Sequence, residues 1–167
     1  KGSKKKLMEL LYRGVFAADL LEDITLRFRP YARVPDEVDR LKKQKLKDLT
    51  ACISQGGGIR SIHHWSEETV RSFQRIDLKY KERFPLVLYM GEIYMRQHDH
   101  YTDHVISMIE SNHLEVVRSP VHEWLHYINA MQRIRSRKSV QIAMRNLRPF
   151  KFLGYTLQWF ESWIRMR

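Results

Sequence analysis

The most constraining feature of this chain is the stretch over residues 84–96, which reads FPLVLYMGEIYMR. A short apolar run follows Pro85 and stops at Gly91, a pattern typical of a buried strand that ends in a loop. A helical pattern, a second apolar strand pattern at 114–117 and another helical pattern from Val121 come next. This alternation with short joints predicts a β-α-β-α unit built on a parallel sheet.

The chain before this unit is predicted to be helical. Apolar residues recur at helical spacing over residues 5–29, and a second helix is expected over 35–53, because proline and acidic residues stand in its first turn. The glycines at 56–58 are expected to end that helix. A third helix is expected over residues 66–84.

These elements predict the α/β class. We expect a three-layer, Rossmann-like lobe with a small parallel sheet, a helical N-terminal subregion and long basic C-terminal helices. The helical subregion covers residues 1–83, and the β-α-β-α lobe with its helical extension covers 84–167. The two are expected to form one compact unit.

Composition narrows the class of protein. A chain of 167 residues with 43% hydrophobic content can bury a core of its own. It contains no apolar run of about 18–20 residues, so we expect no membrane span. Cys52 is the single cysteine, which predicts a reducing, cytoplasmic setting and excludes a self-contained cysteine-ligated iron–sulfur or zinc site.

The charge is strongly basic and unevenly distributed. The formal net charge is +11, and residues 128–167 hold nine Lys or Arg against Glu161 alone. A basic face of this kind can hold an acidic protein, a phosphorylated ligand or nucleic acid, and it can equally be a solvated helix face. A basic interaction module for nucleic acid or an acidic protein is therefore an alternative function. The nucleic-acid interpretation is weak, because no recognisable motif accompanies the charge.

His122, Glu123 and His126 match the pattern H-E-x-x-H. Two histidines four residues apart share a helix face and can bind Zn²⁺, while the glutamate between them polarises a water molecule. A zinc-dependent hydrolase is therefore an alternative function. Zinc needs a third protein ligand, and none stands at the usual spacing, so we expect no metal here.

A second group of polar residues follows the first strand: His98, Asp99, His100, Asp103 and His104. Its spacing fits no standard zinc pattern, so a polar loop at a helix start is the simpler interpretation.

The loop after the first strand is the expected ligand site. Gly91 allows a tight turn, and Glu92, Tyr94 and Arg96 would share one face if the strand continued regularly. The next helix would present free N–H groups near Thr102, which suit a phosphate or carboxylate, and Arg96 would supply a bidentate charge. The alternative is a Glu92–Arg96 ion pair that only stabilises the loop.

The stretch over residues 85–127 resembles the 2-hydroxyacyl-CoA dehydratase family, in its branch of activase-related proteins. The resemblance is carried by an apolar strand before Gly-Glu-Ile-Tyr-x-Arg, then by a helix ending in Glu, an E-V-V strand, Ser-Pro and Glu-Trp followed by Tyr. The residues are Gly91, Glu92, Ile93, Tyr94, Arg96, Glu110, Glu115, Val116, Val117, Ser119, Pro120, Glu123, Trp124 and Tyr127. Upstream, residues 17–21, 27–31 and 36–39 also resemble the family.

This resemblance implies a structural and binding lobe of a larger cytoplasmic protein linked to acyl-CoA dehydration in anaerobic metabolism. Its partners would be the remaining domains or subunits, and a phosphate-bearing ligand such as coenzyme A. Catalytic family members use an iron–sulfur cluster on cysteines that this chain lacks, so we expect no cofactor and no catalytic residue here. Pro120, Glu123, Trp124 and Tyr127 would be structural, with Trp124 buried against the sheet.

Overall fold

The computed structural model describes residues 2–96, 98 and 104–145, and it is mostly helical with a small parallel sheet. The chain divides into two compact units, Lys1–His122 and Glu123–Arg167. The sequence-based boundary at 83/84 lies inside the first unit. The division falls in the first turn of a helix, because Val121 and His122 belong to one unit and the rest of that helix to the other.

Three helices form the first part of the chain. Helix α1 spans Gly2–Phe28, and a short 3-10 helix, η1, spans Arg29–Tyr31. Helices α2 (Pro35–Ser54) and α3 (Ile59–Phe73) pack against α1 and against each other. The structure confirms the first two helices and the end of α2 before the glycines at 56–58.

The third helix begins seven residues earlier than predicted, at Ile59, and ends at Phe73 instead of near Phe84. Its buried residues, Ile62, Trp65, Thr69 and Phe73, recur at helical spacing from the start. The segment after Phe73 leaves the helix because its backbone bonds elsewhere. Arg33 N–H donates to the Asp77 carbonyl at 2.9 Å, and Lys79 N–H donates to the Tyr31 carbonyl at 2.8 Å.

The predicted parallel sheet is confirmed. Strand β1 (Leu86–Tyr89) pairs in parallel with strand β2 (Glu115–Arg118), in a register that opposes Leu86 to Glu115. Helices α4 (Ile93–Arg96) and α5 (Val105–Ser111) connect the strands, and α6 (Val121–Arg145) follows β2. None of the helices in the described part of the chain combines the length and apolar character that crossing a membrane requires.

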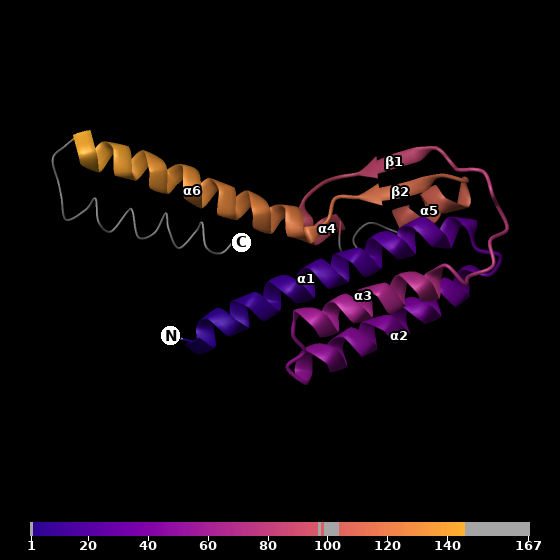
Figure 1. Cartoon of the computed structure of the whole chain (residues 1–167). Coiled ribbons are helices and arrows are strands. Elements are labelled where there is room, and N and C mark those ends of the chain that lie inside the picture. Colours follow the sequence, from indigo (N-terminus) through magenta and orange to yellow (C-terminus); the bar gives the residue numbers. More distant parts are fainter. Residues whose placement is uncertain (1, 97, 99–103, 146–167) are drawn as a thin grey trace. The chain divides into compact units, whose positions relative to one another are not determined.

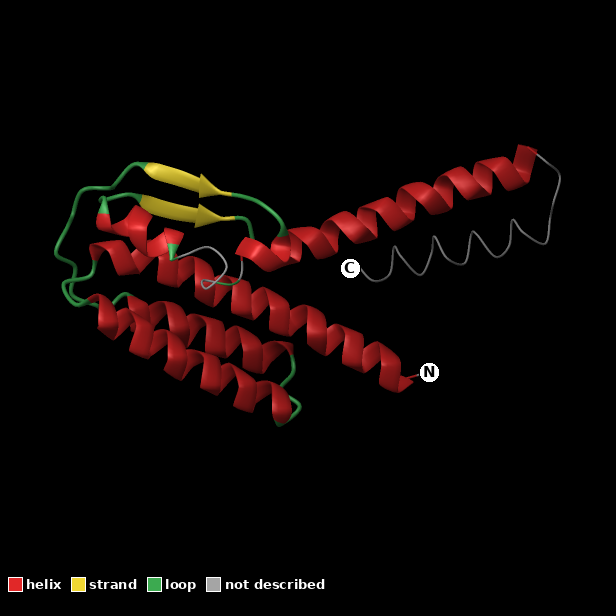
Figure 2. Ribbon diagram, turned by 180° about the vertical axis from the view of Figure 1, so that it is seen from behind, coloured by secondary structure: helices red, strands yellow, loops and turns green. Residues whose placement is uncertain are grey.

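Helix α1 takes part in two hydrophobic cores. Its residues Ala17 and Leu21 belong to the core shared with α2 and α3, while Leu26 packs with Ile106 of α5 and Val116 of β2. Helices α2 and α3 therefore lie on one side of α1 and the sheet lies on the other (Figures 1 and 2).

The sheet is covered on one face. Val116 is 3% exposed beneath α1 and α5, while on the opposite face Leu88 and its partner Val117 are 63% and 41% exposed. The structure thus has the coarse α/β character that was expected, with one helical layer on the sheet among the residues that it describes.

Candidate functional site

The expected ligand site lies where β1 and β2 end. Gly91 has φ +156°, a conformation that L-residues rarely adopt, so the turn requires glycine as predicted. Beyond it the chain forms the helical turn α4 instead of a regular strand. Glu92 Oε2 accepts a hydrogen bond from Met95 N–H at 3.0 Å and so caps this turn.

The helical turn changes which side chains share a face. Tyr94 and Arg96 are two residues apart, which on a helix separates them by about 200°, so the expected common face with Glu92 is wrong. Tyr94 is 59% exposed and its ring lies 5.9 Å from that of His98. Thr102, the expected helix start, lies outside the described residues.

Arg96 joins the loops that follow the two strands. Its Nη1 donates to the Gly91 carbonyl at 3.1 Å, and its Nη2 lies 3.5 Å from the Pro120 carbonyl. Its Nε is buried and has no hydrogen-bond partner. No ion pair of Arg96, to Glu92 or to another acid, occurs in the described part of the chain, so no carboxylate among those residues neutralises its guanidinium.

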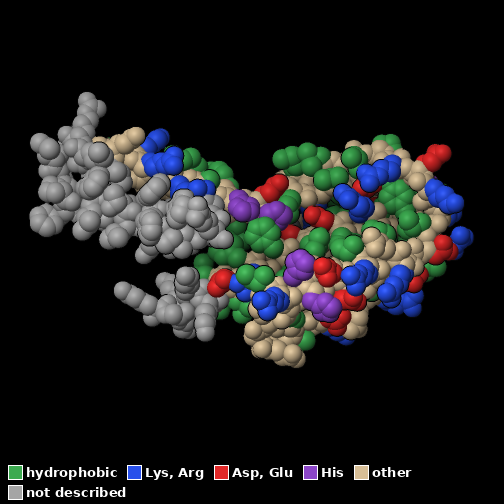
Figure 3. Space-filling view, viewed as in Figure 1, with side chains coloured by type: hydrophobic (Ala, Val, Ile, Leu, Met, Phe, Trp, Pro, Cys, Tyr) green, Lys and Arg blue, Asp and Glu red, His purple; other side chains and the backbone are tan. Residues whose placement is uncertain are grey.

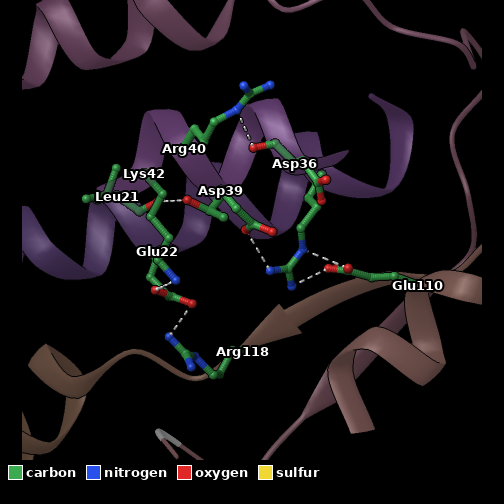
Figure 4. A network of polar contacts seen from close by, with 10 residues as sticks. Leu21, Glu22, Asp36, Asp39, Arg40, Lys42, Glu110 and Arg118 are labelled. Atoms are coloured by element: carbon green, nitrogen blue, oxygen red, sulfur yellow. Dashed lines mark hydrogen bonds and ion pairs between the residues drawn. The ribbon is translucent and has the colours of Figure 1, made fainter. Parts of the chain in front are cut away.

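Arg118, at the end of β2, connects the sheet to the helices. It is 8% exposed, and its Nη2 lies 3.0 Å from Glu22 Oε1 of α1. Its Nη1 donates to the Arg96 carbonyl at 3.3 Å. Glu22 Oε2 in turn lies 2.7 Å from Lys42 Nζ of α2, so Glu22 stands between two cations (Figure 4).

Asp19 of α1 binds the first turn of α6. Its carboxylate accepts hydrogen bonds from the N–H groups of Val121 and His122 at 3.1 and 2.7 Å, and its Oδ2 lies 3.0 Å from His122 Nδ1. The His122 ring also stacks on Phe16, with centroids 4.6 Å apart. A carboxylate already occupies the amino terminus of this helix, where an anion would otherwise bind.

A second polar group joins η1 to α2 and α5. Arg29 makes a bidentate pair with Glu110, with Nε–Oε2 and Nη2–Oε1 distances of 2.8 and 2.9 Å, and contacts Asp39 at 3.2 Å. Burial alone would lower the pKa of Arg29, but the hydrogen bonds and charges of Glu110 and Asp39 outweigh it and raise the pKa.

Tyr31 and Glu115 form a buried hydrogen bond at the start of β2. Tyr31 Oη donates to Glu115 Oε2 at 2.6 Å and accepts from Phe84 N–H at 2.9 Å. Burial, and then the bond to Glu115, raise the pKa of the Tyr31 hydroxyl. The bond ties η1 to both strands, since Phe84 leads into β1 and Glu115 opens β2.

Asp23 has a perturbed carboxyl on the same helix as Asp19 and Glu22. Desolvation and the charge of Asp19 raise its pKa above 3.8, against the opposing effects of His122, Arg118 and Arg27. Burial is therefore the main cause of the raised pKa, and the Asp19 carboxylate, four residues earlier on α1, adds to it.

The residues expected to be structural lie at the start of α6 and directly before it. Trp124 is 49% exposed and Tyr127 is 60% exposed. The packing of Trp124 on the sheet stays a prediction. Pro120 is partly buried, and Glu123 is exposed.

The described residues contain no group of three or more His, Cys, Asp or Glu side chains placed to hold a metal ion. In the H-E-x-x-H pattern, His122 is engaged by Asp19, while His126 is exposed. Of the second histidine group, only His98 and His104 lie within the described residues. The basic residues Arg135, Arg137 and Lys138 of α6 are exposed.

Sequence reasoning missed Asp19, Glu22, Lys42 and Arg118 as parts of this site. One signal was available: Asp19, Glu22 and Asp23 interrupt the apolar pattern of α1 at helical spacing, which marks a second face in contact with other groups. Comparison with protein-family models, with curated proteins and with solved structures found no match for this chain.

Proposed function

We propose that this chain is a structural and binding lobe of a cytoplasmic protein related to the activases of acyl-CoA dehydratases. The contacts among residues of the resembling segments support this. Arg29, from residues 27–31, contacts Asp39, from 36–39, and Glu110. These contacts join three of the resembling segments, as a structural role requires.

Within this lobe, the strand ends bind an anionic group of a ligand such as a phosphate of coenzyme A. The observation that carries this proposal is Arg96. Its guanidinium is half-buried at the carboxyl ends of two parallel strands, with no carboxylate partner among the described residues and with an unpaired, buried Nε. A guanidinium whose charge no described carboxylate neutralises favours an anion, which would accept hydrogen bonds from its Nη groups.

The lobe is half of a three-layer, Rossmann-like arrangement. Helices α1 and α5 form the layer on one face of the sheet, and the remaining domains or subunits of the larger protein supply the layer on the other. The exposed side chains of Leu88 and Val117 support this, because parallel sheets are normally covered on both faces.

The ligand proposal is tested by calorimetric titration of coenzyme A and of an acyl-CoA into the parent chain, Arg96→Lys and Arg71→Lys. Arg96→Lys keeps the positive charge but cannot donate two parallel hydrogen bonds to an anion as a guanidinium does. We therefore expect the dissociation constant to rise about tenfold or more. Arg71, on α3, is an exposed arginine paired only with Glu68 within the described residues, and it serves as the matched control.

Melting temperatures are measured for each variant, because Arg96 also contacts the Gly91 and Pro120 carbonyls. Weaker binding in Arg96→Lys with an unchanged melting temperature supports the ligand site. A parent chain that binds neither compound contradicts it and leaves Arg96 as a link between two loops.

A further inference from the structure

Strand β1 has an open edge. The Pro85 and Tyr89 carbonyls accept hydrogen bonds from Glu115 and Ser119 N–H, so the odd-numbered residues of this strand turn their backbone groups toward β2. The backbone groups of Leu86 and Leu88 therefore point to the other edge. In the part of the chain that the structure describes, no hydrogen bond is made to them.

Exposed apolar side chains lie along this strand. Leu86, Leu88 and Met90 are 61%, 63% and 65% exposed, and Val117 lies beside Leu88 on the same face of the sheet. Hydrophobic side chains gather along the upper margin of the view in Figure 3, where β1 runs in Figure 1. Natural edge strands are usually protected by a charge, a bulge or a proline within them, and Leu86–Tyr89 has none of these.

The charge around the strand indicates what can cover it. Lys79, Lys81 and Arg83 lead into β1 with exposed side chains, against Glu82 alone. A second copy of the chain would bring another +11 charge to this edge, which opposes self-association. A segment with carboxylates would instead be attracted to the basic residues.

We propose that the open edge of β1 accepts an extended segment of a partner protein, with apolar residues at alternate positions and acidic residues beside Lys81 and Arg83. Its backbone pairs with Leu86 and Leu88, and its apolar side chains pack beside Leu88 and Met90. This inference extends the proposed function by naming what continues the sheet, and it does not depend on ligand binding at Arg96.

The test uses a fluorescent synthetic peptide in which valine alternates with threonine between flanking glutamates, and a matched peptide with flanking lysines. Binding to the full chain is measured by anisotropy, and hydrogen exchange of individual amides is followed by NMR. We expect the glutamate peptide to bind more tightly and to slow exchange at the amides of Leu86, Leu88 and Met90 in particular.

Two proline variants separate the edge from the interior of the sheet. Leu88→Pro removes an N–H that points away from β2, so it should abolish peptide binding while the melting temperature holds. Val87→Pro removes an N–H directed at β2 and should lower the melting temperature. Leu88→Lys, at an exposed position, is the second edge variant should Leu88→Pro not fold, and it should weaken binding at least several-fold.

The double variant Lys81→Glu and Arg83→Glu reverses the charge beside the strand. It should bind the glutamate peptide more weakly and the lysine peptide more tightly than the parent chain does. Peptide binding that is absent, or unchanged in both Leu88→Pro and Leu88→Lys, would overturn the proposal. Analytical ultracentrifugation provides a second test. If the parent chain is a dimer and the Leu88→Lys variant is a monomer, a second copy of the chain occupies the edge and the proposal is overturned.

Discussion

At the scale of single residues, two neighbouring arginines make ion pairs in different environments. Arg29 makes a bidentate pair with Glu110, and the two side chains are 19% and 10% exposed. Arg33 pairs with Asp77 near the surface, where the side chains are 62% and 66% exposed. Solvent screens the second pair much more than the first.

We therefore predict that Arg29→Lys lowers the free energy of unfolding by about 1.5–3 kcal/mol, because a lysine cannot reproduce the fork and leaves Glu110 short of a donor. Arg33→Lys is expected to change it by less than about 0.5 kcal/mol. Urea denaturation of both variants measures this, and equal losses would contradict the assigned role of burial.

Asp23 gives a prediction about pH. A carboxyl whose pKa is raised on folding favours the folded state below its unfolded value of 3.8, and this contribution is lost as the pH rises through the folded pKa. Asp23→Asn should therefore stabilise the chain near pH 7, by at most about 1 kcal/mol because the side chain is exposed.

This gain should disappear below pH 3.8, where Asp23 is protonated in both states. Denaturation of parent and variant at both pH values tests the sign. A variant less stable than the parent at pH 7 would show that the attraction to Arg118 and Arg27 exceeds the effects of desolvation and Asp19.

At the scale of elements, the turn from β1 into α4 depends on one glycine. Gly91 has φ +156° and no atom near its missing Cβ, so conformation rather than space restricts this position. We predict that Gly91→Ala costs about 1–3 kcal/mol of unfolding free energy. Gly58, the N-cap of α3, has an ordinary φ of −84° and similar open space and is the control. Gly58→Ala should cost no more than about 1 kcal/mol, because alanine is a poorer cap but meets no backbone strain there.

Two tryptophans on different helices allow a second comparison of elements. Trp65 of α3 is 7% exposed and its Nε1 donates to the Lys45 carbonyl at 3.1 Å, whereas Trp124 of α6 is 49% exposed. We predict that Trp65→Ala lowers the free energy of unfolding by about 3–5 kcal/mol. Trp124→Ala is expected to lower the free energy of unfolding by less. Thermal unfolding measures both variants, and a larger effect of Trp124→Ala would contradict the burial of Trp65.

At the scale of the first unit, α1 joins two hydrophobic cores. Leu26 is 2% exposed and faces the sheet, while Leu21, five residues earlier, is 2% exposed and faces α2 and α3. Because one helix supplies both, loosening one core should weaken the other.

We predict that Leu26→Ala lowers the free energy of unfolding by about 2–5 kcal/mol. Hydrogen exchange of the backbone amides should become faster in β2 and in α3 alike. Native-state hydrogen exchange measures both sets at once. Acceleration confined to β2 would show that the sheet opens separately from the helical core.

The sequence alone determined the local elements of this protein. Helices α1 and α2, both strands, their parallel pairing and the glycine turn after β1 follow from apolar spacing and from residues with restricted backbone conformations, which act over a few positions. Where the local signal was weak, as at the start of α3, acidic residues at 67 and 68 were mistaken for a first turn.

Only the tertiary structure decided which polar residues meet. Arg29 and Glu110 are 81 positions apart, Tyr31 and Glu115 are 84 apart, and Asp19 and His122 are 103 apart. No spacing rule reaches across such distances, because the contacts depend on how α1 packs between the helices and the sheet. For the same reason the sequence suggested a ligand role for Glu92, whereas in the fold Glu92 caps α4 and the Arg96 guanidinium contacts the Gly91 and Pro120 carbonyls.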